Sequence, residues 1–375
     1  MAERNASNQG LHNASKAKND EFYTQLSDIE KEIGHYKEHF KGKTVFCNCD
    51  DPRVSNFFHY FSYNFEFLGL KKLITTCYKS QSADIFSENA SEQAIYLEYE
   101  GEKDGGRVPT VEQIGIKPLK GDGDFRSPEV IELLKEADIV VTNPPFSLFR
   151  EYISQLMEYD KKFLVIGNIN AITYKEIFHL IKQDKAWLGI NMGRGISGFI
   201  VPNHYELYGS EARIDDSGRR IVSTNNCLWL TNLDYPQRHE DLILYKTYKG
   251  NEQEYPKYDN YNAINIDKTK EIPVDYTGAM GVPITFLDKY NPEQFEVIAL
   301  GIIGSVDFSC NKKMEILDKN GQPTGKFTWN AKGTLYRKYN SETDKTAAFK
   351  DCETGDLYSS IYARILIRNK RVGGV

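Results

Sequence analysis

Residues 143–146 combine types and spacing that could hold a planar amino group. Asn143, Pro144, Pro145 and Phe146 directly follow the segment DIVVT, which has the composition of a buried strand. The prolines fix the backbone and remove two N–H donors, so the Pro144 carbonyl and the Asn143 side-chain oxygen become rigid acceptors beside the Phe146 ring. Two acceptors beside an aromatic face suit a ring with an exocyclic NH2. The indicated chemistry is attack by that nitrogen, helped by positioning and by stabilisation of developing positive charge, without a strong base.

The surrounding elements predict where this run lies. Five strands are predicted in the first half of the chain, over residues 43–49, 71–78, 138–142 and 161–170 and over a short piece that begins at residue 116. Helical patterns separate them through residue 185, which favours an α/β fold with a parallel sheet. Ligands of such sheets bind at the carboxyl ends of the strands, where residues 143–146 are expected. The alternative is a rigid loop that only terminates a strand.

Helix signals support this arrangement. After a short extended piece, apolar residues recur at helical spacing, at Ile29, Ile33, Tyr36 and Phe40. Ser127 is a good N-cap, and Pro128 suits the first position of the helix that precedes the DIVVT strand. Beyond about residue 186, glycines, aromatic residues and short β-like runs predominate, which predicts a β-rich second region.

Composition limits the class of protein. The chain has 375 residues, 40% hydrophobic and 27% charged, as expected of a globular protein with a substantial core. No apolar run is long enough to cross a membrane, and the first twenty residues lack the apolar core of a secretion signal, so we expect a cytoplasmic protein. The six cysteines include no C-x-x-C pair, which favours buried reduced thiols over a zinc or redox site. A net charge of −6 argues against a general nucleic-acid coat but permits a local basic cleft.

A dozen collinear blocks resemble one known family. Asn-Pro-Pro followed by an aromatic residue is typical of methyltransferases that modify adenine or cytosine amino groups in DNA. Together with that run, blocks such as DEFYTQ, CNCDDPRVSNFF, GDGDFRS, SGFIVP, NNCLWLTNLD and MGVPITFL resemble the EcoRI-type adenine methyltransferase family. The resemblance implies a Rossmann-like S-adenosylmethionine-dependent methyltransferase sheet with a β-rich C-terminal target-recognition region.

The resemblance also implies the division of the chain. We expect a flexible N-terminus over residues 1–20, a catalytic domain over 21–235 and a target-recognition region over 236–375. Residues 301–361 depart from the family pattern and are predicted to be an insertion of β-hairpins with an Asn-Gly turn. This insertion would extend the DNA footprint or bind another partner.

A cofactor pocket is implied in the same way, for S-adenosylmethionine and its product S-adenosylhomocysteine, without a metal. The residues expected to line it are Phe22, Tyr23, Thr24, Asp50, Asp51, Pro52, Cys77, Tyr78, Asp122, Asp124 and Phe125. Most relatives have a glycine-rich turn where Asp50 and Asp51 stand, and a solvated turn is the alternative there. No acidic residue follows the second strand, so Thr76, Cys77 or Tyr78 would contact the ribose. Asp122 competes with Asp124 for the contact to the adenine of the cofactor.

The expected partner is double-stranded DNA, from which the target base must be flipped. Phe199 is a candidate second stacking face opposite Phe146, with a place in the core as the alternative. Arg194, in the glycine-rich segment 193–198, is a candidate phosphate contact, and the basic tail ARILIRNKR is either a phosphate contact or a solvated edge strand.

The family's activity is methylation of the adenine 6-amino group at GAATTC, by an apparent monomer, as protection from a cognate restriction endonuclease. We expect a similar activity here. The alternatives are another acceptor, such as the cytosine 4-amino group, RNA or protein glutamine, and a DNA-binding relic without catalysis.

Overall fold

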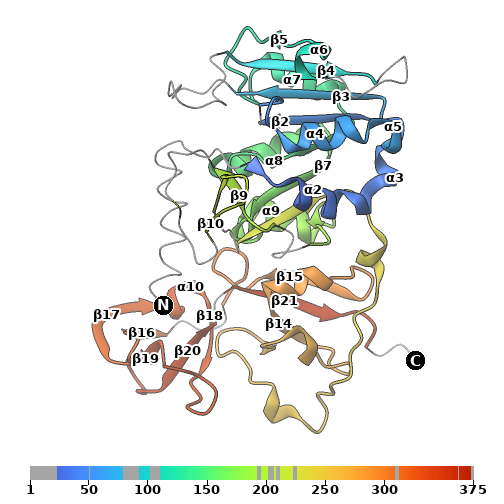
Figure 1. Cartoon of the computed structure of the whole chain (residues 1–375). Helices are drawn as coiled ribbons and strands as arrows, with labels where there is room; N and C mark the ends of the chain where they lie inside the picture. The colour runs from blue at the N-terminus through green and yellow to red at the C-terminus, as the bar shows by residue number, and fades with distance from the viewer. Residues whose placement is uncertain are drawn as a thin grey trace. The chain divides into compact units, whose positions relative to one another are not determined.

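The computed structural model describes residues 23–49, 51–78, 93–101, 110–191, 196–201, 207, 212–222, 226–308, 312–361 and 363–372 (Figure 1). The chain forms two compact units. The first comprises Met1–Ile177 and Ala186–Tyr235, and the second Phe178–Lys185 and Pro236–Val375. The predicted division into catalytic and target-recognition domains is a functional assignment and stays a prediction.

The first unit is built on an eight-stranded sheet. Its strands, in spatial order, are β5 (Lys117–Pro118), β4 (Ile95–Tyr99), β3 (Lys72–Cys77), β2 (Thr44–Cys49), β6 (Ile139–Thr142), β7 (Lys162–Asn168), β12 (Cys227–Thr231) and β8 (Trp187–Leu188). The four central strands, β3, β2, β6 and β7, are parallel, as predicted. The flanking strands pair antiparallel, so the sheet as a whole is mixed and the fold is mixed α/β.

Short helices accompany this sheet. They are α2 (Leu26–Ile33), η1 (Gly34–Tyr36), α3 (Lys37–Phe40), α4 (Asn56–Tyr63), α5 (Phe65–Leu68), α6 (Val111–Ile114), α7 (Pro128–Glu136), η2 (Phe146–Leu148), α8 (Phe149–Glu158), η3 (Ile169–Thr173) and α9 (Lys175–Lys182). The helical spacing predicted in the N-terminal segment is confirmed, because its four apolar residues are fully buried. Ser127 caps α7 by accepting the Val130 N–H, with Pro128 as the first helical residue, also as predicted.

A small second sheet brings distant segments of the first unit together. Its strands, in spatial order, are β1 (Tyr23–Thr24), β9 (Phe199–Val201), β11 (Arg220–Val222) and β10 (Arg213–Ile214). In register, Thr24 lies opposite Phe199 and Tyr23 opposite Ile200. The N-terminal extended piece is therefore held against a segment more than 170 residues later in the chain.

The second unit contains two sheets. One has the order β13 (Ala263–Asn265), β14 (Ala279–Pro283), β21 (Arg364–Asn369) and β15 (Phe295–Leu300). The other has the order β17 (Pro323–Trp329), β16 (Lys313–Leu317), β19 (Phe349–Asp351), β20 (Leu357–Ile361) and β18 (Leu335–Lys338). Short helical turns connect them: η4 (Pro236–His239), η5 (Glu252–Glu254), η6 (Thr269–Glu271), η7 (Ile284–Lys289) and α10 (Asn330–Gly333).

Two predictions for this region have clear outcomes. The hairpin with an Asn-Gly turn is confirmed by the antiparallel pairing of β16 with β17. The interpretation of the basic tail as an edge strand is wrong, because β21 lies between β14 and β15. Its arginines are also engaged, Arg364 with Asp267 and Arg368 with Glu296.

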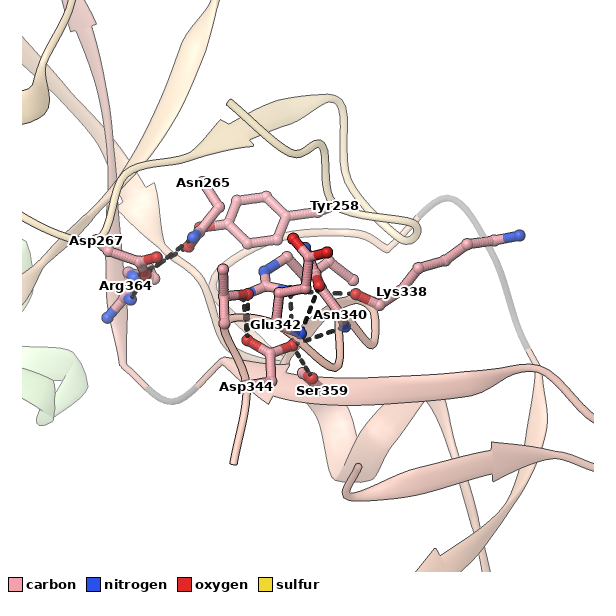
Figure 2. A network of polar contacts seen from close by, with 11 residues as sticks. Tyr258, Asn265, Asp267, Lys338, Asn340, Glu342, Asp344, Ser359 and Arg364 are labelled. Atoms are coloured by element: carbon pink, nitrogen blue, oxygen red, sulfur yellow. Dashed lines mark hydrogen bonds and ion pairs between the residues drawn. The ribbon is translucent and has the colours of Figure 1, made fainter. Parts of the chain in front are cut away.

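The five-stranded sheet is anchored to the rest of its unit. Leu335 and Ile361 pack in one apolar cluster with Ala299 and Leu366 of the neighbouring sheet. Beside this cluster, Asp344 accepts hydrogen bonds from the Ser359 hydroxyl (2.6 Å) and the Asn340 N–H (3.1 Å) (Figure 2). Arg337 completes this network with two parallel bonds to Asp344, of 2.7 and 2.8 Å.

The structure also bears on cysteines, metals and membranes. Cys47, Cys77 and Cys227 are buried, whereas Cys352 is exposed, so the prediction of buried thiols is wrong for Cys352. Cys310 lies outside the described residues. Within the described ranges, no helix is long and apolar enough to cross a membrane, and no cluster of acidic, histidine and cysteine side chains is suited to a metal ion.

Candidate active site

The ends of three neighbouring strands line up at one edge of the large sheet. Cys49 of β2 is in register with Cys77 of β3. Phe46 is in register with Val140 of β6, and continuing that register places Asn143 level with Cys49. Chain order reverses across the sheet between β3 and β6, with β2 at the switch, and ligands of open α/β sheets bind at such switch points.

Buried hydrogen bonds to Asn48 of β2 fix the base of the loop that follows β6. The Thr142 hydroxyl donates to the Asn48 carbonyl, and the Tyr152 hydroxyl of α8 donates to the Asn48 side-chain oxygen. Asn143 itself is 8% exposed, and Pro144 is buried. The Pro145 carbonyl accepts the Leu148 N–H (3.0 Å) and so begins the turn η2, which carries Phe146. The four predicted catalytic residues therefore lie on a rigid strand-to-helix turn.

Phe146 is half-buried and rests against Phe199. Their ring centroids are 6.1 Å apart and the rings are nearly perpendicular, at 62°. Phe199 is fully buried, so in this structure it offers no open face to a base. Of the two interpretations of Phe199 that the sequence allows, the place in the core describes its position here. Its buried ring packs against the ring of Phe146.

The N-terminal extended piece joins the same neighbourhood. Thr24 pairs with Phe199, and its carbonyl accepts a hydrogen bond from the Asn56 side chain (2.7 Å) at the start of α4. The Thr24 hydroxyl oxygen is buried and has no hydrogen-bond partner among the residues that the structure describes. Tyr23 is half-buried, and Phe22 lies outside the described residues.

Asp51 is engaged by Arg53. The Asp51 carboxylate accepts the Arg53 backbone N–H (2.9 Å) and its Nε (2.9 Å), and the side chain of Asp51 is 5% exposed. This hydrogen bonding raises the pKa of Arg53. Pro52 is buried, and Asp50 lies outside the described residues. The predicted interpretation as a solvated turn does not fit Asp51, whose carboxylate is buried and fixed.

Cys49, at the end of β2, has an unusual backbone conformation that the sequence interpretation did not single out. Its φ of 86° lies in the left-handed region, which side chains other than glycine rarely adopt. It ends the strand directly before Asp50 and Asp51, where most relatives have a glycine-rich turn and this chain has no glycine. The signal was available, because a turn of that kind without a glycine forces another residue into the unfavourable conformation.

The GDGD turn lies against the end of β3. Gly123 has a φ of +78°, and an added Cβ would approach the Cys77 carbonyl oxygen to 2.3 Å. Only glycine allows this contact, which brings the turn beside Cys77. Tyr78, one residue later, is 41% exposed.

The two acidic residues of this turn differ in surroundings. Asp122 is exposed and accepts the Asp124 N–H (3.0 Å). Asp124 accepts the backbone N–H (2.9 Å) and Nε (2.8 Å) of Arg126, which holds the pKa of the Asp124 carboxyl below its usual value. Phe125 is buried edge-on to Tyr152, with ring centroids 5.1 Å apart. Asp51 and Asp124 thus share one device, an aspartate fixed by the arginine two residues later.

Two carboxylates of α2 hold the segments on both sides of residues 192–195. Glu32 is fully buried and accepts the N–H groups of Ile190 (2.9 Å) and Asn191 (3.0 Å). Asp28 accepts the Ser197 N–H (2.8 Å), and burial raises the pKa of Asp28 although that bond opposes the rise. Arg194 lies outside the described residues, so its predicted DNA contact stays a prediction.

Comparison with known proteins identifies the family. The family model described as "Adenine-specific methyltransferase EcoRI" matches residues 10–370. The chain belongs to the EcoRI family of adenine-specific methyltransferases. Type II methyltransferase M.EcoRI of Escherichia coli is 60% identical over 321 residues, which cover 84% of this chain and 98% of that protein. No solved structure matches the chain.

Two relatives with lower identity come from mycoplasmas. Type II methyltransferase M.MgeORF184P of Mycoplasma genitalium is 42% identical over 77% of this chain and 85% of its own length. M.MpnI of Mycoplasma pneumoniae is 40% identical over 77% of this chain and 84% of its own length. The chain is therefore a DNA adenine methyltransferase of the restriction-modification type, as predicted from the sequence blocks.

Membership in the EcoRI family implies S-adenosylmethionine as methyl donor, and the strand-end residues fit such a group. The buried hydroxyl of Thr24 is a polar atom available to a ligand, and the close approach of the Gly123 turn to the Cys77 carbonyl brings the GDGD turn to the end of β3. Asp51 and Asp124 fit less directly, because each already binds an arginine. We therefore infer that the main role of Asp51 and Asp124 is to fix the conformation of their loops. The remaining lone pairs of their carboxylates are open to a ligand.

Proposed function

We propose that this chain transfers a methyl group from S-adenosylmethionine to the 6-amino group of an adenine flipped out of duplex DNA. The unit with the eight-stranded sheet would be a Rossmann-like catalytic domain, and the second unit would recognise the target. The observation that carries the proposal is the alignment of the Asn143 loop with the ends of β2 and β3. That alignment supports the proposal, because an acceptor loop at Asn143 and cofactor loops at the ends of β2 and β3 would then be neighbours.

The amino group would be held by the loop after β6. The Asn143 side-chain oxygen and the Pro144 carbonyl would each accept one N–H bond, which directs the nitrogen lone pair away from the ring plane. As the nitrogen attacks, positive charge develops on it, and these two acceptors stabilise that charge. The methyl donor supplies an electrophilic carbon on a sulfonium, and the surplus proton of the product leaves to water.

Stacking would be supplied by Phe146. Its ring is braced by the buried Phe199 and follows two prolines, so little freedom remains to be lost when a base stacks on it. By resemblance we expect a GAATTC-like target, a monomeric enzyme and a cytoplasmic location. The protection of DNA from a cognate endonuclease would be the biological role.

The test is base-modification sequencing of DNA from cells that express the chain, beside an Asn143→Ala variant. Methyladenine at GAATTC that vanishes in the variant supports both chemistry and target, and methyladenine at another site supports the chemistry alone. With purified protein, loss of the amide acceptor is expected to lower kcat by about 10²–10³-fold, the range measured for removal of one such group. Asn262→Ala, which removes an exposed amide of the second unit, is the matched control. Folded protein that methylates no adenine would refute the proposal.

A further inference from the structure

The five-stranded sheet of the second unit interrupts a connection between two neighbouring strands. The chain leaves β15 at Leu300 and returns in β21 at Arg364, and Leu300 is in register with Ile365. These two strands already complete the four-stranded sheet without the intervening residues. The five-stranded sheet is therefore an addition to the second unit, at the position predicted for the insertion, and its surface calls for an explanation of its own.

One face of this sheet combines aromatic rings with lysines. Directly opposed residues of an antiparallel sheet project to the same side. Lys313 opposes Trp329, Glu315 opposes both Phe327 and Lys350, and Lys350 opposes Leu357. We name this side the outer face, defined by Lys313, Phe327, Trp329, Lys350 and Leu357. The opposite side carries the buried Met314, Phe349 and Tyr358.

The rings of the outer face are open to solvent. Phe327 is 55% exposed and Trp329 is 57% exposed. Single exposed apolar residues are ordinary, but two large rings on one side of one strand mark a contact surface. The Lys313 ammonium lies 5.1 Å from the centroid of the Phe327 ring, so a cation and an aromatic face are presented together.

The lysines of the outer face have no acidic partner. Within the described residues, neither Lys313 nor Lys350 forms an ion pair with a carboxylate. The adjacent Lys312 contrasts with them, because it is held by Asp259 (3.1 Å), Asp351 (3.7 Å) and the Tyr358 hydroxyl (2.7 Å). The one carboxylate on the outer face, Glu315, accepts the Gly325 N–H (3.3 Å).

The backbone next to the rings is strained. Asn330, Ala331 and Lys332 follow Trp329 directly, with φ of 45°, 49° and 60°. Left-handed backbone is unfavourable for residues other than glycine, and such strain concentrates at functional sites. This turn ends the exposed strand β17 immediately after Trp329.

We propose that the outer face binds the DNA substrate outside the methylated site. Lys313 and Lys350 would contact phosphates, and Phe327 and Trp329 would pack on sugars or on unstacked bases. This inference rests on the proposed function, since it takes DNA as the ligand. Charge favours DNA over a second copy of the chain, because two such faces would bring unneutralised lysines together.

The test measures binding of the full chain to a long duplex that extends well beyond one GAATTC site, over a range of salt concentrations. Lys313→Gln with Lys350→Gln is expected to weaken binding and to lower the slope of log K against log salt by about two, one for each phosphate contact. Phe327→Ser with Trp329→Ser is expected to weaken binding about tenfold or more, with the slope unchanged. Because the changed side chains are exposed, both variants should fold, and the lysine variant tests the proposal even if the aromatic variant does not.

Two controls separate the possible failures. Lys326→Gln removes the same charge from the opposite side of β17 and should change neither the slope nor the affinity. A short duplex that spans only the GAATTC site should be methylated by both outer-face variants at the wild-type rate. If folded wild type methylates no adenine in duplex DNA of any sequence, the proposed function fails, whatever the binding results. Unchanged binding and slope in both outer-face variants, or an equal loss in Lys326→Gln, would overturn the inference.

Discussion

The left-handed backbone of Cys49 allows a test in which the usual order of stability, with an alanine variant more stable than a glycine variant, is reversed. At ordinary positions alanine is more stable than glycine by about 0.4–1 kcal/mol, because glycine loses more chain entropy on folding. At a φ of 86° any Cβ costs about 1–2 kcal/mol, which outweighs that entropy term. We therefore expect Cys49→Gly to be more stable than Cys49→Ala by about 0.5–1 kcal/mol.

A β-branched residue extends the same test to function. Cys49→Val keeps an apolar side chain but adds a second γ atom, and β-branched residues avoid this backbone conformation. We expect it to cost about 1–3 kcal/mol in the free energy of unfolding, or to move the strand end and lower the rate of methyl transfer. Cys49→Gly should keep near-wild-type methyl transfer, because the strand end keeps its conformation level with Asn143.

The assay is urea unfolding of the three variants and wild type, paired with single-turnover methylation of a duplex containing GAATTC. The comparison of glycine with alanine isolates the backbone term, since neither variant has the thiol. A Cys49→Ala protein more stable than Cys49→Gly would show that Cys49 is not strained. A Cys49→Val protein with unchanged stability and rate would refute the link between this strand end and the site.

Two further predictions concern charged groups. Arg337→Met removes the charged partner of the Asp344 carboxylate and leaves it only the hydrogen bonds from Ser359 and Asn340. Since both side chains of the ion pair are nearly buried, at 7% and 12% exposed, urea unfolding at pH 7 should show a loss of about 3–5 kcal/mol. The pKa of Asp344 is lowered to about 2, so the stability that the pair provides is present above the ordinary aspartate pKa of about 4 and is lost as the pH falls towards 2. The exposed pair of Arg368 and Glu296 is the control, and Arg368→Met should cost less than about 1 kcal/mol. Glu32→Gln should lower the free energy of unfolding by about 1–3 kcal/mol, because one of the backbone N–H groups at Ile190 and Asn191 loses its acceptor. We also expect it to weaken DNA binding. Unchanged affinity in an anisotropy titration would contradict a role for that segment in binding DNA.

Sequence patterns predicted local structure well and missed what depends on distant partners. The N-terminal helical spacing and the Ser127 cap were readable because both are set by residues within a turn or two of each other. The antiparallel edges of the large sheet could not be predicted, since the local sequence of β4 or β12 does not determine with which neighbouring strand each will pair. The central place of β21 was missed for the same reason, because its neighbours β14 and β15 come from separate parts of the chain.

The candidate site shows the same limit at the level of single residues. The Asn143 loop could be located because its chemistry is carried by four consecutive residues. The engagement of Asp51 and Asp124 was missed, although the repeated spacing of aspartate and arginine, two residues apart, was visible in the sequence. Spacing alone does not reveal that both carboxylates turn back to their own arginine, since the turn depends on how each loop is packed.

Packing also connects the two halves of the candidate site. Thr24, in the predicted cofactor loop, pairs with Phe199, and the Phe199 ring braces Phe146, in the predicted base loop. A ligand that orders β1 would therefore also restrain Phe146 through a strand pairing and one ring contact. Rigid elements with direct contacts are the means by which distant sites are coupled. Occupation of the cofactor pocket is thus expected to favour base stacking, and DNA binding in return to favour the cofactor, by the same factor.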